Sequence, residues 1–313
     1  MKYDIVCSTK NLSTEEWLKM RTIGIGGSDA SIIAGCNPYC SIFELWQEKR
    51  GEIPVKEEES EVIHFGKVLE DVVRKEFIQR TGLMVRKKNS ILRSKEYPFM
   101  IADLDGVVSE FDGTYSIFEA KTAIEFKNND WKNGEIPKAY QLQVQHYLAV
   151  TGFQKAYIAV LVGGNKFYWT EVYRDEQLIK MLVSMESHFW HCVREGEEPD
   201  VDASKATSLY LGAKYNNAKV GSVIDLDEQM LSAIEKYEQI KIELDSLTEK
   251  KRLVENQLKS ALAENEAGRV GGHIVKWKQV VQTRIDSSKL KEKHKDIYDD
   301  CKKEVIYRKF SVA

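Results

Sequence analysis

The stretch over residues 100–122 constrains the fold of this chain more than any other. It reads MIADLDGVVSEFDGTYSIFEAKT, with an alternating, β-branched and aromatic run on each side of Asp112-Gly113. An Asp-Gly pair between two such runs is a strong signal for a β-hairpin. A hairpin that folds about residue 112 sets Asp105 on the first strand opposite Glu119 on the second, with their Cβ atoms about 5 Å apart.

The second strand adds a lysine to this pair of carboxylates. Side chains alternate along a strand, so Glu119 and Lys121 share one face and Ala120 points to the other. Carboxylate oxygens are the ligands that Mg²⁺ prefers, and a nearby ammonium can orient a water or offset charge. Asp103 lies on the same face as Asp105 and is an alternative partner for Lys121. Taken alone, Asp105, Glu119 and Lys121 are equally consistent with an ordinary ion pair on a solvated face.

The order of the other elements predicts an α/β core with a mixed sheet flanked by helices. Ser13 opens a capping box for a first helix that carries Trp17 and Arg21. Further strands are expected over 84–92, 156–162 and 167–172, and helices over 139–151 and 176–195. A helix over 62–80 is expected to bury an apolar stripe made of Phe65, Leu69, Val72, Val73 and Phe77, with Glu70 beside it.

The C-terminal third has a different pattern of apolar residues. Apolar residues keep a heptad spacing over 226–264 and are interrupted once, by Lys251, which predicts a long helix of coiled-coil type. A strand over 273–285, a helix over 286–301 and a strand over 304–312 are expected to follow. We therefore divide the chain into a core over 1–205, a helical coiled-coil-like segment over 206–266 and a small basic segment over 267–313.

Composition limits the class of protein. The chain has 313 residues and a net charge of −3, and no run approaches the ~18 apolar residues of a membrane span. The N-terminus lacks the apolar centre of a signal peptide, so we expect a cytoplasmic protein with no membrane partner. Five cysteines in a chain of this length do not make a disulfide framework. Lys and Arg cluster over 86–95 and again over 268–313, where they could form an anion-binding groove or two solvated faces.

The motifs combine in a specific order. A Gly66-x-x-x-Glu70 helix precedes the Asp105 strand, the Glu119-x-Lys121 strand and a Gln143-x-x-x-Tyr147 helix. Together they resemble the PD-(D/E)xK nuclease superfamily, and most of all lambda exonuclease and the YqaJ-type viral recombinases. Trp17-x-x-x-Arg21 followed by Gly27-Ser28 is similar to the opening motif of that family. The resemblance covers about residues 10–200 and implies a restriction-endonuclease-like core.

The resemblance implies a role for each matching residue. Glu70, Asp105, Glu119 and the backbone carbonyl of Ala120 would hold the metal. Lys121 would be the catalytic lysine, Gln143 would hold the water or the lysine, and Tyr147 would support that helix. Arg21 and Ser28 would bind the 5′-terminal phosphate of DNA. The leading Pro of the motif is Leu104 here, which leaves the adjacent ligand unchanged.

The resemblance also implies an activity and its partners. We expect a Mg²⁺-dependent deoxyribonuclease with two ions, Mn²⁺ being the alternative metal. It would act as a phage-type 5′→3′ exonuclease on double-stranded DNA in recombination and leave 3′ single strands for an annealing protein. Since family members form rings, often trimers, the resemblance also implies a homo-oligomer, a ring and possibly a trimer, in the cytoplasm of a bacterial or phage-infected host cell. A structure-specific or nicking endonuclease with the same site is one alternative, and a catalytically inactive DNA-binding or assembly protein is another.

Overall fold

The computed structural model describes residues 2–55, 60–219, 221–305 and 307–312. The chain divides into two compact units, Met1–Lys214 and Tyr215–Ala313. All the candidate site residues lie in the first unit, and the three-part division stays a prediction. Across the described ranges, no helix is long and apolar enough to cross a membrane.

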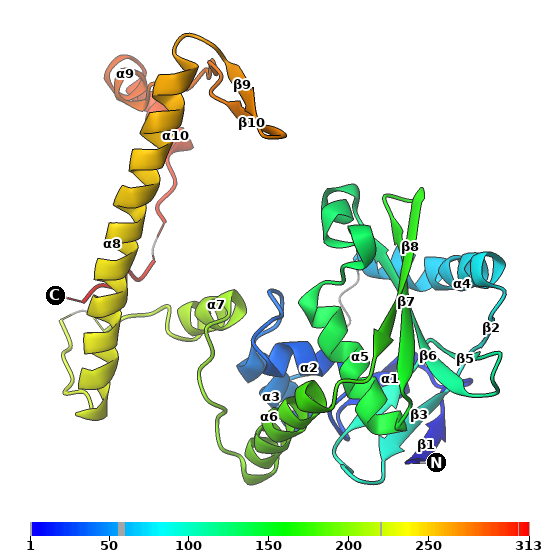
Figure 1. Ribbon diagram of the computed structural model, residues 1–313. Coiled ribbons are helices and arrows are strands. Elements are labelled where there is room, and N and C mark those ends of the chain that lie inside the picture. The colour runs from blue at the N-terminus through cyan, green and yellow to red at the C-terminus, as the bar shows by residue number, and fades with distance from the viewer. Residues whose placement is uncertain (1, 56–59, 220, 306, 313) are drawn as a thin grey trace. The chain divides into compact units, whose positions relative to one another are not determined.

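The first unit is built on a five-stranded sheet (Figure 1). Its strands, in the order β2-β5-β6-β7-β8, are Met84–Arg86, Gly106–Ser109, Tyr115–Ala123, Lys155–Val162 and Lys166–Tyr173. Strand β6 pairs antiparallel with β5 and parallel with β7, so the sheet is mixed. The predicted α/β class with a central mixed sheet is therefore confirmed.

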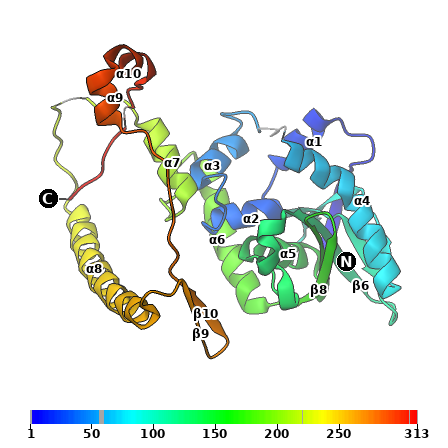
Figure 2. The ribbon, with the colours of Figure 1, turned by 90° about the horizontal axis from the view of Figure 1, so that it is seen from above.

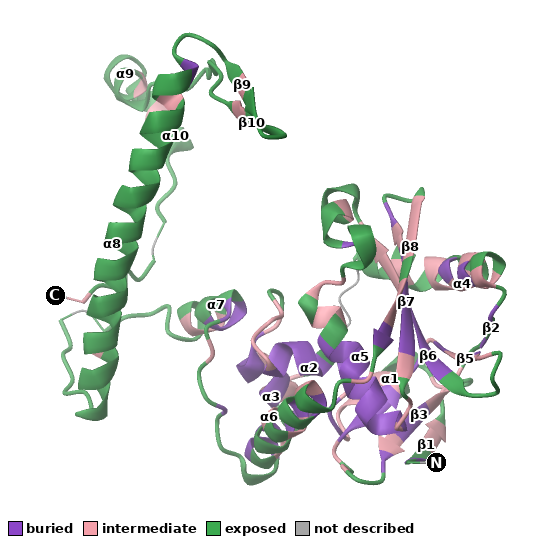
Figure 3. Ribbon diagram, in the orientation of Figure 1, coloured by how far each residue is buried: buried purple, intermediate pink, exposed green. Residues whose placement is uncertain are grey.

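Helices cover both faces of this sheet. Figure 1 shows α4 (Glu61–Thr81) on one side and α5 (Lys138–Thr151) on the other. Since alternate residues of a strand face opposite sides, β6 gives Phe118 to the α4 side, where its ring lies 5.1 Å from that of Phe77. The next residue, Glu119, faces α5. Figure 3 shows the buried residues concentrated in β6, β7, α5 and α2 (Gly27–Ile33).

The remaining elements of the first unit frame this core. A second, three-stranded antiparallel sheet has the order β1-β3-β4. The predicted capping box forms, with the Ser13 hydroxyl accepting from the Glu16 amide at 3.2 Å. The elements are β1 (Tyr3–Ser8), α1 (Thr14–Arg21), α2 (Gly27–Ile33), α3 (Ile42–Arg50), β3 (Ser90–Ser94), β4 (Ile101–Asp103), η1 (Glu125–Asp130), η2 (Lys132–Gly134), α6 (Glu176–Glu195) and α7 (Lys205–Lys214).

The apolar stripe predicted for α4 is only partly buried, so that expectation was partly wrong. Val73 is fully buried with Phe77, but Phe65 is 50% exposed and Val72 is 49% exposed. The second half of the helix packs on β6 and β7, whereas the first half lines a pocket through residues such as Gly66. The periodicity of apolar residues predicts a helix. It does not show which part of that helix packs on a sheet.

The second unit contains the expected long helix, α8 (Gln229–Leu262). The prediction for the segment after it was partly wrong. β9 (Ala267–Val270) and β10 (His273–Lys276) form a short hairpin, so the strand expected over 273–285 ends early. The expected helix over 286–301 is two helices, α9 (Ser287–Lys293) and α10 (Lys295–Cys301). The described residues of 304–312 form no strand, and a strand needs a hydrogen-bonded neighbour to persist.

Candidate active site

The β5–β6 hairpin has the predicted register, with Gly106 paired to Phe118. Asp105 lies in a bend just before β5 and not on the strand as predicted, because the chain passes there from β4 in the second sheet to β5 in the first. The Ala120 amide donates a hydrogen bond to Asp105 Oδ2 at 2.8 Å. Asp105 is therefore fixed to the backbone of β6, directly beside the residues that carry the other acid and the lysine.

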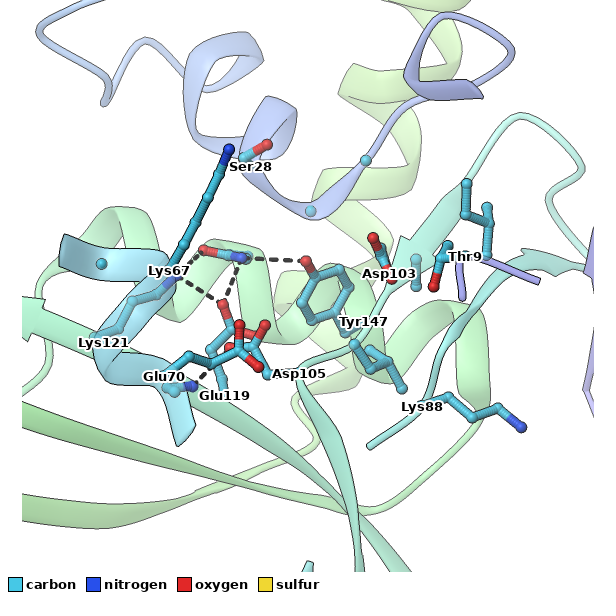
Figure 4. A pocket seen from close by; sticks show the side chains of 18 of the residues that line it. Thr9, Ser28, Lys67, Glu70, Lys88, Asp103, Asp105, Glu119, Lys121 and Tyr147 are labelled. Atoms are coloured by element: carbon cyan, nitrogen blue, oxygen red, sulfur yellow. Dashed lines mark hydrogen bonds and ion pairs between the residues drawn. The ribbon is translucent and has the colours of Figure 1, made fainter. Parts of the chain in front are cut away.

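Glu119 is the centre of a hydrogen-bonded cluster on the α5 side of the sheet (Figure 4). Its Oε1 atom accepts from Lys121 Nζ at 2.7 Å and from Gln143 Nε2 at 2.7 Å. Lys121 Nζ also donates to Gln143 Oε1 at 3.1 Å, and Gln143 Nε2 donates to the Tyr147 hydroxyl at 3.2 Å. The sequence-predicted lysine, glutamine and tyrosine thus meet around one carboxylate.

The second oxygen of Glu119 differs from the first in its surroundings. Glu119 is 2% exposed, and its Oε2 atom is buried without a hydrogen-bond donor among the described residues. A buried, unpaired carboxylate oxygen costs free energy unless a cation or a donor satisfies it. This oxygen therefore marks the point of the cluster at which a cation would be stabilised.

The carboxylates disfavour one another's charge. Burial, and then the Glu119 carboxylate, raise the pKa of Asp105 to about 7. Burial raises the pKa of Glu119, and burial with the Asp105 charge raises the pKa of Glu70. For Lys121, burial alone would lower the pKa, but the Glu119 and Asp105 charges outweigh it and raise the pKa. Glu119 and Asp105 thus share the Lys121 ammonium, which leaves negative charge for a further cation.

Glu70 approaches this cluster from α4. Figure 4 shows its carboxylate beside those of Asp105 and Glu119. Lys87 Nζ lies 3.5 Å from Glu70 Oε1 and 2.8 Å from Asp71 Oδ1. In the described part of the chain, no three His, Cys, Asp or Glu side chains are arranged to hold a metal ion. The donor set and the unpaired Glu119 oxygen fit a divalent cation, while Glu70 is turned toward a lysine.

The candidate phosphate-binding residues line the same pocket, which has a volume of about 660 Å³. Arg21 donates to the Ser28 hydroxyl at 3.1 Å, so these two predicted residues are in contact. In the view of Figure 2, α1 is drawn near the beginning of α4, and residues of both helices, such as Arg21 and Ile63, line the pocket. Lys67 and Lys88 also line the pocket, so cationic as well as acidic side chains surround it.

A buried ion pair holds the loop between α1 and α2. Lys49 Nζ lies 2.6 Å from Asp29 Oδ2 and donates to the carbonyls of Arg21 and Gly24 at 2.6 and 2.8 Å. Asp29 in turn accepts from the Gly26 amide at 2.8 Å. Sequence reasoning missed Lys49, because nothing in the pattern of α3 distinguishes it from a solvated lysine.

Two further contacts position the site, and neither was expected. The Asp103 carboxylate accepts a hydrogen bond from the Trp17 indole at 2.9 Å. The sequence had allowed Lys121 as the partner of Asp103, and the structure gives it Trp17 instead. His146 is fully buried on α5, where its Nδ1 atom lies 2.9 Å from Glu186 Oε1 and its Nε2 atom lies 2.9 Å from the Ile101 carbonyl oxygen. The sequence signal that could have identified His146 was its position one turn after Gln143. These contacts tie α1, α5 and α6 to strand β4.

Helix α2 packs closely on the helix that carries Gln143. A Cβ atom on Gly27 would lie 2.4 Å from Cε1 of Tyr147 and 3.0 Å from Cγ of Gln143. Only a residue without a side chain fits at this contact. Gly27 therefore sets the distance between the Ser28 end of the pocket and the Gln143 cluster.

Comparison with known proteins gives a family match and a full-length relative. The family described as the YqaJ-like viral recombinase domain matches residues 16–154. The protein YqaJ of Bacillus subtilis (strain 168) is 42% identical over 312 residues, which span 99% of this chain and 97% of that protein.

Two solved structures are also similar. The alkaline exonuclease LHK-Exo of Laribacter hongkongensis is 20% identical with a TM-score of 0.49, over 58% of this chain and 94% of its own. A phage-related exonuclease of Haemophilus somnus 129PT is 15% identical with a TM-score of 0.41, over 58% of this chain and 100% of its own. Because the relative from Bacillus subtilis matches over almost its full length, this chain belongs to the family with the YqaJ-like viral recombinase domain.

Proposed function

We propose that this protein is a metal-dependent deoxyribonuclease, and specifically a 5′→3′ exonuclease on double-stranded DNA that leaves 3′ single strands. The observation that carries the proposal is the cluster of Asp105, Glu119, Lys121 and Gln143, in which one buried carboxylate oxygen has no hydrogen-bond partner within the described part of the chain. Membership of a viral recombinase family supports a role in recombination.

The acidic side chains would hold the metal. Glu119 and Asp105 would provide oxygens with the Ala120 carbonyl, and Glu70 would join them once it leaves Lys87. Bound Mg²⁺, with Mn²⁺ as the alternative, supplies a water activated for attack on the phosphodiester and positive charge for the leaving oxygen. Burial and the Glu119 charge raise the pKa of Asp105, and a bound cation would lower it again, since a nearby positive charge stabilises the ionised form.

The remaining residues would act on the substrate and the water. The Lys121 ammonium would orient the attacking water and offset charge at the phosphate. Gln143 would hold Lys121 and Glu119 in register, because it contacts both. At the other end of the pocket, Arg21 and Ser28 would bind the terminal 5′-phosphate of the DNA. A guanidinium and a hydroxyl suit the oxygens of a phosphate monoester.

Digestion of labelled DNA tests the proposal. Linear, 5′-phosphorylated duplex labelled at either end is incubated with Mg²⁺ or with EDTA, beside a closed circular duplex. We expect loss from the 5′ ends of the linear DNA only, and none in EDTA. Cutting of the circle would instead identify an endonuclease. Intact substrates under all conditions would contradict both activities and favour a DNA-binding or assembly protein.

A substitution assigns the cleavage to this site. Lys121→Ala removes the ammonium from the cluster, and we expect the rate to fall by about 10²–10⁴-fold, as is typical for a group that assists proton transfer or charge development. Lys127→Ala is the matched control, because Lys127 is 63% exposed and lies outside the pocket. Equal rates for Lys121→Ala and wild type would show that the cleavage comes from elsewhere. Circular dichroism of both variants checks the fold.

A further inference from the structure

The long helix α8 carries an apolar stripe that the described residues of its own unit leave largely exposed. Ten positions follow the 3-4 heptad spacing, and all but Lys251 are apolar: Met230, Ala233, Tyr237, Ile240, Leu244, Leu247, Lys251, Val254, Leu258 and Ala261. Leu244 is 58% exposed and Leu247 is 60% exposed, and within α8 only Leu262 is buried. The ring of Phe310 rests on Tyr237 at 5.7 Å, which covers one position of the ten.

A stripe of this kind is typical of a coiled coil. Apolar residues at a and d positions over more than four heptads form a seam that needs a facing helix. The 34 residues of α8 span about 51 Å at 1.5 Å per residue. Exposed apolar patches of such length mark interaction surfaces.

We propose that α8 pairs with α8 of a second copy of this chain in an antiparallel coiled coil. The heptad positions are symmetric about the middle of the helix, between residues 245 and 246. In the centred antiparallel register Leu244 faces Leu247, Ala233 faces Leu258, and every a or d position meets a d or a position of the second copy. Lys251 then faces Ile240 instead of another charge.

The flanking charges favour this arrangement. In an antiparallel coiled coil the g positions of the two helices face each other, as do the e positions. The centred register sets Glu243 beside Lys250 of the second copy, twice by symmetry, and brings no like charges together. A shift of one heptad sets Glu243 against itself in one direction and Lys250 against itself in the other.

The parallel alternative is less favourable by the same criterion. In a parallel pair each a position faces its own copy, so two Lys251 ammonium groups would meet inside the seam. Facing g and e positions would place Lys236 beside Lys241 of the second copy, twice, against two attractive contacts between Lys250 and Glu255. Like charges that face each other are destabilising by amounts similar to the gain from opposite ones.

Disulfide trapping in the full-length chain tests the orientation. The background variant Cys301→Ser removes the exposed thiol of the second unit, which could otherwise form an unintended disulfide. The other four cysteines are buried or half-buried and are kept. The variant A233C/L258C is then oxidised and run on a non-reducing gel. The two new thiols are about 38 Å apart along one helix, so they cannot link within a chain. We expect a covalent dimer in most of the protein.

The single variants A233C and L258C are the matched controls, and we expect neither to form a dimer above the background variant. Dimers of either single variant would show that the helices pair in parallel and would overturn the proposal. Absence of linked product in A233C/L258C would overturn it as well, since α8 would then be covered by something other than a second α8.

A charge exchange gives an independent test. Ile240→Lys places a second ammonium group opposite Lys251 of the other copy, whereas Ile240→Glu places a carboxylate there. We expect I240K to reduce disulfide trapping of A233C/L258C at least tenfold and I240E to leave it nearly unchanged. Ile242→Lys is the control, because Ile242 is 70% exposed at the outward f position. Equal losses with I240E and I240K would overturn the proposed facing of Ile240 and Lys251.

Discussion

Asp105 is the residue whose chemistry the rest of the site controls most. Its Oδ2 atom is hydrogen-bonded to the Ala120 amide, yet burial and the Glu119 charge raise its pKa from 3.8 to about 7. Between these values the folded protein keeps a proton that the unfolded chain has lost. Stability therefore falls as pH rises from about 4 to about 7, because the folded state then binds more protons than the unfolded state.

This titration predicts the effect of Asp105→Asn. The amide oxygen can still accept from the Ala120 amide, but no charge has to be buried above pH 7. In EDTA we expect D105N to unfold at a higher temperature than wild type at pH 8 and at nearly the same temperature at pH 4. Each gain of about 1 kcal/mol in the free energy of unfolding raises the unfolding temperature by about 2–4 °C for a chain of 150–250 residues. Differential scanning calorimetry at the two pH values measures the difference.

The exposed residue Asp130 supplies the control, since its side chain is 46% exposed. Asp130→Asn should change the unfolding temperature little at either pH. A D105N protein less stable than wild type at pH 8 would contradict the raised pKa of Asp105.

At the scale of elements, the contact between α2 and α5 depends on one glycine. A methyl group at position 27 would press on the Tyr147 ring, so Gly27→Ala is expected to cost about 1–3 kcal/mol of stability, as overpacking does. Gly66→Ala makes the same change within α4, where the added Cβ would meet nothing closer than 3.8 Å. There we expect a gain of about 0.5–1 kcal/mol from the better helix former. Urea unfolding of both variants measures the two signs.

A third variant makes this prediction specific. Tyr147→Leu removes the ring that Gly27→Ala would strike. The double variant should therefore be more stable than the sum of the two single effects predicts. Additive effects would mean that the methyl group at position 27 disturbs something other than Tyr147.

Elements set by local pattern were predicted from the sequence, and those set by tertiary neighbours were not. The Asp112-Gly113 turn dictated the β5–β6 register, and the heptads dictated α8. The exposed half of α4 and the missing strand over 304–312 depend on what lies beside them, which periodicity does not encode. Lys49 and His146 were missed for the same reason, since their partners are far away in the sequence.

At the scale of the whole molecule, the first unit contains a complete core. Every buried cluster of the described residues, and the whole candidate site, lies within Met1–Lys214. A chain that ends at residue 214 is therefore expected to unfold cooperatively, within a few degrees of the first transition of the full-length protein. We expect it to retain Lys121-dependent cleavage. Aggregation or a non-cooperative transition would show that the second unit contributes to the core.

The contact between Gly27 and Tyr147 also bears on how this family changes over time. Two helices meet there with no space for a methyl group, so either position limits what the other accepts. A lineage that loses the aromatic ring at position 147 becomes free to gain a side chain at position 27, whereas the reverse order passes through a destabilised intermediate. Substitution at the two positions is therefore expected to be correlated and directional, with the helix α5 residue changing first.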